Sequence, residues 1–575
     1  MPSALEVQQL LTAPGAAFEL VDELVRGVAM PVYKHRMPSL RSVAALGLAR
    51  GTETCLVFGD RRISFAGCVE AANSVSYHLM SDAGVTSGDR VAVLSANNPE
   101  WVYTFWGTVD LGAVLVGLNG WWKGNEVAYG LADSGARLLV ADRDRFRRVA
   151  DRLDTLPDLE RVYLVDADPE EFGADPRLRR FDELLAAPTQ AMPETEIGED
   201  DPAVIFYTSG TTGRSKGAIS THRSMIANLQ NTFYHHVAGS MIRGDNGLVG
   251  RGGGRSAALL TSPLFHVSGC HSGIVIAMAA GVTNVMTVGK FDPVAAMRLI
   301  ADEQVTIWAT VPTMVARVVE HPGRHDYDLS SVTTVACGGS PIGPRLQHRI
   351  RETFPNVIVV GNAYGLTESS AVATVISGAD LVERPNSVGR PVPGMQVRIV
   401  TGAGTDALGG EVGEVWLRGA LITPGYWGKP DETASALTPD GWLRTGDIGF
   451  VDDDGFLSIT DRVKDVIIRG GENVYSVEIE DRLLEHTAVA DAAVIGVPHP
   501  ILGEEVRAVV SVVPGTAATS VTEGELRAWV GQTLADFKVP AYVEITVDPL
   551  PRNATGKLLK NLLRGYGPER FAETF

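Results

Sequence analysis

Short apolar runs alternate with segments of helical spacing along most of the chain. Residues 90–94, 137–140, 257–260 and 333–336 have the length and composition of buried strands. Residues 65–80 and 293–303 instead carry apolar side chains at helical intervals. Strands that alternate with helices in this way indicate α/β organisation. The longest apolar stretch, residues 274–288, is interrupted by Gly281 and Asn284 and is too short to span a bilayer, so we expect a buried helix and strand there.

The pattern changes after Asp461. The last stretch, about 110 residues long, has alternating strand patterns at 489–497 and 506–513 and an amphipathic helix at 523–534. We expect a multidomain α/β protein with two parts. Residues 1–463 form a large N-terminal domain of α/β subdomains, and residues 464–575 form a small, mobile α+β domain.

Composition narrows the class of protein. A chain of 575 residues with 45% hydrophobic content can bury several cores, and its formal charge of −19 argues against a nucleic-acid partner. The first residues lack a basic segment followed by an apolar core, and no two of the four cysteines form a CxxC pair. We therefore expect a cytoplasmic protein without a transmembrane segment. Peripheral membrane association and a homodimer both remain open.

The most informative segment is the glycine-rich run at residues 207–217, which follows the apolar residues 203–206. Its glycines let backbone N–H groups turn toward an anion, its hydroxyls can donate to phosphate oxygens, and Arg214 and Lys216 supply positive charge. The spacing differs from that of the common P-loop. A flexible polar linker is the alternative that this run alone leaves open.

Five further segments follow in order. An aromatic residue, a hydroxyl and a carboxylate (Tyr364, Thr367 and Glu368) come after the β-branched run 357–360, at the predicted carboxyl end of a strand, where open α/β sheets bind ligands. Next come residues 441–449 with Asp447 and residues 461–465. The last two are a Gly-Gly-Glu-Asn-Val-Tyr segment at 470–475 and residues 551–557.

In this order the segments resemble those of the adenylate-forming superfamily, which includes acyl-CoA synthetases, adenylation domains of peptide synthetases and beetle luciferases. The resemblance extends from about Thr52 to Lys560. It implies that ATP, Mg²⁺, coenzyme A and a small carboxylic acid are the ligands. A carboxylate would attack the α-phosphorus of ATP and expel pyrophosphate, and a thiolate would then displace AMP from the acyl-adenylate.

The resemblance assigns the nucleotide site. The glycine-rich loop from Thr208 to Gly217 would hold the β- and γ-phosphates of ATP. Glu368 would hold Mg²⁺, and Thr367 would contact the α-phosphate. Asp447 and Arg462 would bind the ribose, and Tyr364 would offer its ring to adenine. The full set implied for the nucleotide is Thr208, Ser209, Gly210, Thr211, Thr212, Gly213, Lys216, Gly338, Gly339, Ser340, Asn362, Ala363, Tyr364, Gly365, Thr367, Asp447 and Arg462.

The resemblance also implies a domain rotation between the two steps. Lys557 would bridge the substrate carboxylate and the α-phosphate in the first step, a task suited to a point charge on a flexible stem. Lys464 would be the hinge. Gly470 and Gly471 would line the passage for the thiol of CoA. A solvated surface lysine and a simple β-turn are the alternatives for Lys557 and the glycine pair.

The acid is less well specified. His266 occupies the family segment beside the substrate carboxylate, and apolar residues nearby suggest a hydrophobic pocket: Val267, Cys270, Ile274, Trp308, Val311 and Met314. Adenylation domains for amino acids usually have Asp where this chain has His266, so a buried partner for a substrate ammonium is missing. No carrier domain follows the last motif.

The most favoured interpretation is an AMP-forming acyl-CoA ligase for a medium or long fatty acid. The alternatives are an acyl-AMP ligase that loads a carrier protein, a steroid or aromatic acid ligase, luciferase-type chemistry and a non-catalytic acyl-nucleotide-binding regulator.

Overall fold

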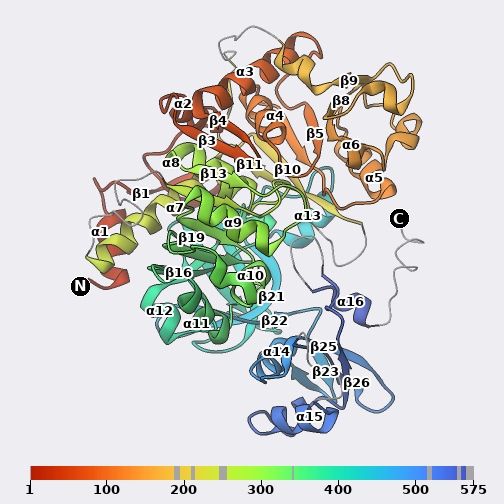
Figure 1. Ribbon diagram of the computed structural model, residues 1–575. Helices are drawn as coiled ribbons and strands as arrows, with labels where there is room; N and C mark the ends of the chain where they lie inside the picture. Colours follow the sequence, from red (N-terminus) through yellow and green to blue (C-terminus); the bar gives the residue numbers. More distant parts are fainter. Residues whose placement is uncertain are drawn as a thin grey trace.

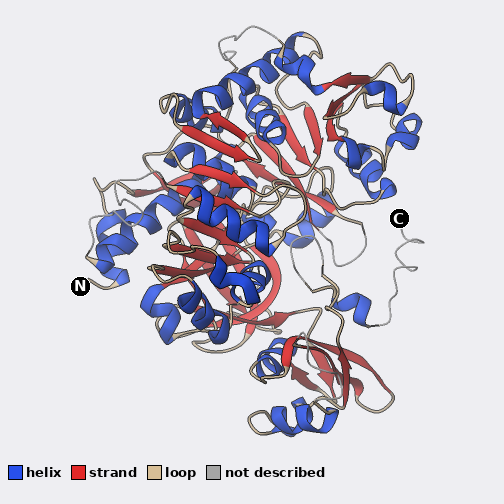
Figure 2. Cartoon of the chain, viewed as in Figure 1, coloured by secondary structure: helices blue, strands red, loops and turns tan. Residues whose placement is uncertain are grey.

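The computed structural model describes residues 2–186, 195–208, 214–244, 256–339, 342–513, 521–552 and 558–564. Figure 1 shows a large body of sheets and helices with a small domain below it, and Figure 2 separates the strands from the helices around them. The chain is a multidomain α/β protein, as the sequence predicts.

The first sheet of the large domain is parallel except at one edge. Its central strands are fully buried, which explains their continuous apolar runs. The last strand in the order pairs antiparallel with its neighbour and forms a hairpin with it. Across the sheet the order is β9 (Leu178–Arg180), β8 (Arg161–Val165), β7 (Leu138–Asp142), β5 (Arg90–Leu94), β6 (Val114–Gly117), β10 (Pro202–Thr208) and β11 (Lys216–Thr221).

The second sheet is a long one that changes character along its width. In the spatial order given below, the strands from β3 to β16 pair in parallel with their neighbours. The edge pair β4–β3 and every pair after β16 are antiparallel. The order is β4 (Arg61–Ser64), β3 (Thr54–Phe58), β13 (Thr283–Met286), β12 (Ala257–Leu260), β14 (Ile307–Thr310), β15 (Thr334–Gly338), β16 (Val359–Tyr364), β17 (Thr374–Ser377), β18 (Ser387–Pro391), β22 (Leu457–Arg462), β21 (Leu443–Val451), β20 (Gly413–Gly419) and β19 (Met395–Val400).

Helices pack the two sheets into one body. One apolar cluster contains side chains from strands of both sheets together with α3 and α4, including the fully buried Trp101 and Trp106. The helices of the large domain are α1 (Ala4–Thr12), α2 (Leu40–Leu48), α3 (Phe65–Ser81), α4 (Pro99–Asp110), α5 (Gly124–Ser134), α6 (Arg143–Phe146), α7 (His222–Arg243), α8 (Ile276–Ala280), α9 (Pro293–Glu303), α10 (Pro312–Val319), α11 (Pro344–Thr353), α12 (Gly378–Glu383) and α13 (Pro430–Ala436).

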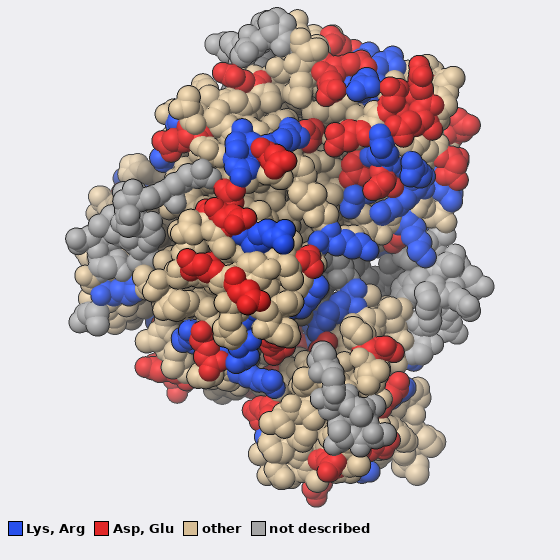
Figure 3. Space-filling model, in the orientation of Figure 1, with Lys and Arg blue, Asp and Glu red and all other residues tan. Residues whose placement is uncertain are grey.

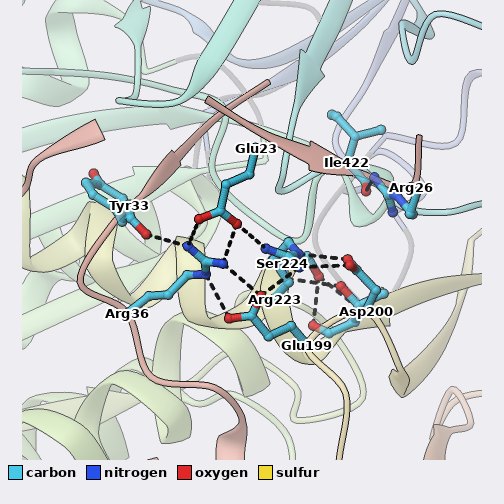
Figure 4. Close-up of polar contacts among 10 residues, drawn as sticks. Glu23, Arg26, Tyr33, Arg36, Glu199, Asp200, Arg223, Ser224 and Ile422 are labelled. Carbon is cyan, nitrogen blue, oxygen red and sulfur yellow. Dashed lines mark hydrogen bonds and ion pairs between the residues drawn. The ribbon is translucent and has the colours of Figure 1, made fainter. Parts of the chain in front are cut away.

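An N-terminal hairpin, β1 (Leu20–Val25) and β2 (Val28–Tyr33), is fixed to the start of α7 by paired charges (Figure 4). Arg36 bonds Glu23 at 2.7 Å and Glu199 at 2.8 Å, and Arg223 on α7 bonds Glu199 at 2.6 Å and Asp200 at 2.8 Å. Because each guanidinium meets carboxylates on both sides, the network is a structural tie and offers little free charge to an anion.

The small domain has its own core. Its sheet contains β24 (Glu472–Val474), β23 (Ile467–Arg469), β26 (Gly503–Val512) and β25 (Val489–His499), with β27 (Tyr542–Thr546) parallel to β26. Apolar residues of α14 (Ser476–Leu484) and α15 (Glu523–Gly531) pack with this sheet in one cluster. The short helix α16 (Lys560–Leu563) contacts β25.

The periodicity predictions agree with these elements to within a few residues: 90–94 is β5, 65–80 is α3, 293–303 is α9, and 274–288 contains α8 and β13. One placement is wrong. The run at 357–360 was expected to end before the aromatic residue, but β16 continues through Tyr364 because residues 361–364 pair with β17. Tyr364 is therefore a strand residue, and Thr367 and Glu368 follow the strand.

Charge is spread over the visible surface, where acidic and basic side chains are interspersed (Figure 3). In the described ranges, no helix is both long and apolar enough to cross a membrane. All four cysteines are buried and unpaired.

Candidate active site

The predicted phosphate loop joins β10 to β11. These strands pair antiparallel with Thr208 opposite Lys216, so the two ends of the loop lie side by side. Residues Ser209, Gly210, Thr211, Thr212 and Gly213 at its tip lie outside the described residues. Arg214 is stacked 5.3 Å from the ring centre of Tyr129.

A tyrosine that the sequence did not single out connects this loop to the predicted metal carboxylate. Lys216 Nζ lies 5.4 Å from the ring centre of Tyr426, and the Tyr426 hydroxyl donates to Glu368 Oε1 at 2.8 Å. The Thr423 amide donates to the Glu368 carbonyl at 2.7 Å. Burial raises the pKa of Tyr426, as does the neighbouring Glu368, so its hydroxyl remains a donor. A cation, an aromatic hydroxyl and a carboxylate thus meet at one place.

Replacing Glu368 by glutamine is expected to raise the Mg²⁺ concentration needed for adenylate formation, because a neutral amide is a poor ligand for a hard cation. Adenylation at limiting Mg²⁺ should fall at least tenfold, since even residues that only support metal ligands are worth roughly 10–100-fold. Tyr426→Phe is the matched control. It keeps the carboxylate, so we expect a smaller effect. Unchanged pyrophosphate release by Glu368→Gln across a Mg²⁺ titration would contradict the assignment.

The predicted ribose residues form a second cluster. Asp447 on β21 is directly opposite Arg462 on β22, and Arg462 Nε lies 3.0 Å from Asp447 Oδ1. The Tyr364 hydroxyl donates to Asp447 Oδ2 at 2.7 Å. Burial raises the pKa of Tyr364 well above its ordinary value, with Asp447 as the next cause. Three residues far apart in the sequence are therefore joined around one buried carboxylate.

The contacts of Asp447 differ in part from the expectation. Ribose hydroxyls were expected as its partners, but each of its oxygens already has a protein partner. Because a carboxylate has about four lone-pair positions, it can accept further bonds from a ligand. Tyr364 and Arg462 fix the orientation of this carboxylate.

Asp447→Ala is expected to weaken ATP and AMP binding by roughly 1.5–3 kcal/mol, because the charged acceptor is lost. Asp447→Asn keeps the shape of the side chain but not its charge. Its nucleotide affinity should lie between those of the unmodified protein and Asp447→Ala. Calorimetry on folded variants measures this loss. Nucleotide affinity equal to that of the unmodified protein in Asp447→Ala would remove Asp447 from the site.

Strand ends bring the remaining predicted residues together. Gly338, the last residue of β15, pairs with Ala363 of β16, and Gly339 has a φ of +83°. A Cβ on Gly365 would lie 1.6 Å from the Ala371 carbonyl oxygen, so only glycine fits there. Asn362 is buried, and its Oδ1 has no hydrogen-bond partner among the described residues. Ser340 lies outside them.

The predicted acyl wall is divided between two cores. Val267, Cys270 and Ile274 belong to the cluster between the sheets. Trp308 belongs to another cluster. Its indole N–H donates to Thr261 at 3.1 Å, and its ring lies against Phe291. Trp308 is therefore packed within a core.

Further residues of the predicted set lie at the start of the small domain. Lys464 lies in the turn between β22 and β23, where the Asp465 amide donates to the Arg462 carbonyl at 2.8 Å. Gly470 and Gly471 form the two-residue turn between β23 and β24, with φ values of +61° and +92°. A turn with positive φ at both positions favours glycine whatever else the pair does.

Lys557 itself lies outside the described residues, but both flanks of its segment are anchored to the small domain. Arg552 pairs with Asp491 at 2.7 Å and forms a β-bridge to Leu558. Lys560 Nζ lies 2.7 Å from Glu480 Oε1 and 2.6 Å from Ser476 Oγ.

The comparisons with known proteins match most of the chain. The model of the AMP-binding enzyme matches residues 48–427, and that of the AMP-binding enzyme C-terminal domain matches residues 478–557. The chain belongs to the AMP-binding enzyme family. Within that family it is an enzyme of the AMP-forming acid–thiol ligase class.

Three relatives of this AMP-binding protein indicate the range of substrates. It is 34% identical over 524 residues to a 7a-methyl-1,5-dioxo-octahydroindenyl-propanoyl:CoA ligase of Rhodococcus jostii, covering 89% of this chain and 96% of the relative. It is 33% identical over 511 residues to the long-chain-fatty-acid–CoA ligase FadD13 of Mycobacterium tuberculosis, which covers 88% of this chain and 93% of FadD13. The solved structure of the anthranilate CoA ligase AuaEII with anthranoyl-AMP aligns with a TM-score of 0.81 and 26% identity. The alignment covers 93% of this chain and 98% of AuaEII.

Proposed function

We propose that the protein joins a hydrophobic carboxylic acid to coenzyme A through an acyl-adenylate. The observation that carries this proposal is the pair of clusters described above. Lys216, Tyr426 and Glu368 meet at one end of the site, and Tyr364, Asp447 and Arg462 meet at the other. Glu368 follows four residues after Tyr364, so a single segment of chain connects the two clusters.

In the first step the acid's carboxylate oxygen attacks the α-phosphorus and the bond to pyrophosphate breaks. The two anions are brought together by positive charge, since electrostatic stabilisation supplies most of the rate enhancement in such transfers. Lys216 offsets charge at the β- and γ-phosphates, and Lys557 offsets it between the carboxylate and the α-phosphate. Asp447, oriented by Arg462 and Tyr364, holds the ribose. The buried Oδ1 of Asn362 can accept an N–H bond from the base.

Mg²⁺ fits this arrangement as a partner of the phosphates. The described residues hold no group of three or more metal ligands, and Mg²⁺ is commonly bound by one or two carboxylates together with substrate phosphates. When bound, it neutralises charge on the transferring group. Glu368, held by Tyr426, is the carboxylate that would bind it.

In the second step the CoA thiolate attacks the acyl carbonyl and AMP leaves with the oxygen that came from the acid. We propose that the small domain turns about Lys464 between the steps, which withdraws Lys557 and presents the Gly470–Gly471 turn to the thiol. The short connection between β22 and β23 is the place where few backbone angles need to change.

The acid is proposed to be hydrophobic, with a medium or long fatty acid and a polycyclic or aromatic acid as the competing classes. FadD13 acts on long-chain fatty acids, and the other two relatives act on ring acids. A ligase that loads a carrier protein remains the second candidate. The non-catalytic regulator is no longer one, because the chain belongs to an enzyme class and the paired clusters retain the charges that turnover needs.

A panel of acids assayed with ATP and CoA tests this proposal. We expect pyrophosphate release that depends on the acid and AMP release that depends on CoA. Pyrophosphate release without any effect of CoA on AMP would favour the carrier-protein ligase. No acid-dependent pyrophosphate release across the panel would contradict the proposal.

A further inference from the structure

Helix α7 carries a polar stripe on a buried face. Asn228, Asn231 and His235 are spaced three and four residues apart, so their side chains lie on the same side of the helix. Asn228 is 1% exposed and Asn231 is 2% exposed. A helix in a core normally buries apolar side chains at such positions.

Much of this polar stripe has no hydrogen-bond partner in the described part of the chain. Both amide atoms of Asn228, Nδ2 of Asn231 and Nε2 of His235 are unpaired. Asn231 Oδ1 does accept a bond from the Tyr33 hydroxyl at 2.6 Å, so that amide presents its N–H donors. Leaving buried polar groups unpaired costs free energy, so each of these groups needs a partner from outside the described residues, either water or a ligand.

A second element contributes the same kind of group. Helix α7 packs against the π-helical turn Cys270–Val275, and such turns are frequent at functional sites. His271 in this turn is 1% exposed and stacks on Phe206 at 5.4 Å. Its Nδ1 lies 3.3 Å from the Ser370 carbonyl oxygen, which can only accept, so Nδ1 carries the proton.

The neutral ring of His271 therefore presents Nε2 as an acceptor. Burial lowers the pKa of His271 to about 4, which keeps the ring uncharged near neutral pH. Its Nε2 has no partner among the described residues. The π-helical turn and the α7 stripe together offer donors at Asn228 and Asn231 and acceptors at Asn228 and His271.

These groups lie next to the proposed acyl site. The turn begins four residues after His266, whose carbonyl accepts from the Cys270 amide at 2.9 Å. Ser370, the partner of His271, comes two residues after Glu368. His271 thus lies near both the predicted wall for the acid and the predicted metal carboxylate, and α7 packs against the turn that carries it.

We propose that these atoms form the distal end of the acyl site, and that the substrate is a hydrophobic acid with a ketone or hydroxyl oxygen far from its carboxylate. This inference rests on the proposed ligase function and narrows its substrate class. An oxygen at that end pairs with the amides and the imidazole, whereas a plain alkyl chain leaves them unpaired. Sites built to hydrogen-bond a substrate group reject the analogue that lacks it.

Matched pairs of acids test this inference. One pair is a saturated fatty acid and the same acid with a ketone near its methyl end, and the other is cyclohexylpropanoic acid and its ring ketone. We expect kcat/KM for the ketone of at least one pair to be roughly tenfold or more above that of its parent. Asn228→Leu should remove this preference.

Gln230→Leu is the control variant. Gln230 is on the same helix and its Oε1 is also unpaired, but its Nε2 donates to the His35 carbonyl, toward the N-terminal hairpin. This variant should keep the preference for the ketone. Binding of each acid is also followed by the shift in melting temperature, which does not require turnover.

The outcomes separate the proposed ligase function from the proposed polar end of the acyl site. Without ligand, Asn228→Leu should melt at or above the temperature of the unmodified protein, because it removes an unpaired buried amide. If it melts lower and the ketone preference is absent or unchanged, the stripe holds structural water and the inference fails. If no acid is turned over but ketones still raise the melting temperature more than their parents, the ligase proposal fails and the polar site stands.

Discussion

Lys557→Ala is expected to lose roughly 10²–10³-fold in acyl-adenylate formation, which is the scale of one preorganised charge contact at a reacting centre. Its segment is held on both sides, by Arg552 with Asp491 and by Lys560 with Glu480. Both described flanks of the segment are therefore anchored to the small domain. Rapid-quench measurement of adenylate formed from ATP and acid gives the size of the loss.

The second half-reaction is the control for this variant. Thioester formation from supplied acyl-adenylate and CoA should be nearly unchanged in Lys557→Ala, because the proposed rotation removes this lysine before the thiol attacks. Equal losses in both half-reactions would mean that one fixed arrangement serves both steps.

Lys560→Met is expected to lower the free energy of unfolding of the small domain by about 3–5 kcal/mol, the usual cost of removing one partner of a buried ion pair. The Lys560 ammonium lies between the carboxylate of Glu480 and the hydroxyl of Ser476, and both its side chain and that of Glu480 are 12% exposed. Ser476 Oγ also donates to Asp461 of β22 at 2.8 Å, so the same group stabilises the contact between the domains. Chemical unfolding measures the loss.

Lys538→Met is the matched control in the same domain. Lys538 Nζ lies 2.6 Å from Glu478 Oε2, but the two side chains are more exposed, Lys538 at 21% and Glu478 at 36%. We therefore expect the free energy of unfolding to fall by less than about 1 kcal/mol. Similar losses in the two variants would contradict the importance of the buried pair.

The stability lost in Lys560→Met should also depend on pH. Burial raises the pKa of Glu480 from 4.5 to about 7, so the folded state retains a proton that the unfolded state has lost. The contribution of Glu480 to stability is therefore present below pH 4.5 and decreases as pH rises through about 7. Without Lys560 the carboxylate is harder to ionise, so the destabilisation should be larger at pH 8 than at pH 5. A loss that does not change with pH would contradict this account.

The spacing of apolar residues was enough to predict most helices and strands, and the motifs in their order were enough to indicate the family. The buried strands of the first sheet have continuous apolar runs, and helices such as α9 have a clear start at Asp292 and Pro293. The end of β16 was missed because it is set by pairing with β17, a contact that no local pattern contains.

The sequence did not predict the residues that hold the site together across the chain. Tyr426 lies 58 residues from Glu368 and is one aromatic residue among many until the fold brings it to the carboxylate. The polar stripe of α7 was missed for a similar reason. Asparagine in a long helix usually faces solvent, and only the fold shows that Asn228 and Asn231 are buried.

The most direct test of the two-step account follows the oxygen atoms. An acid labelled with heavy oxygen in its carboxylate is turned over with ATP and CoA, and the AMP and the thioester are analysed by mass spectrometry. The account predicts one labelled oxygen in each AMP, with one pyrophosphate released for each thioester formed, because the acid's oxygen attacks the α-phosphorus and leaves with AMP. Unlabelled AMP, or release of ADP and phosphate in its place, would contradict formation of an acyl-adenylate.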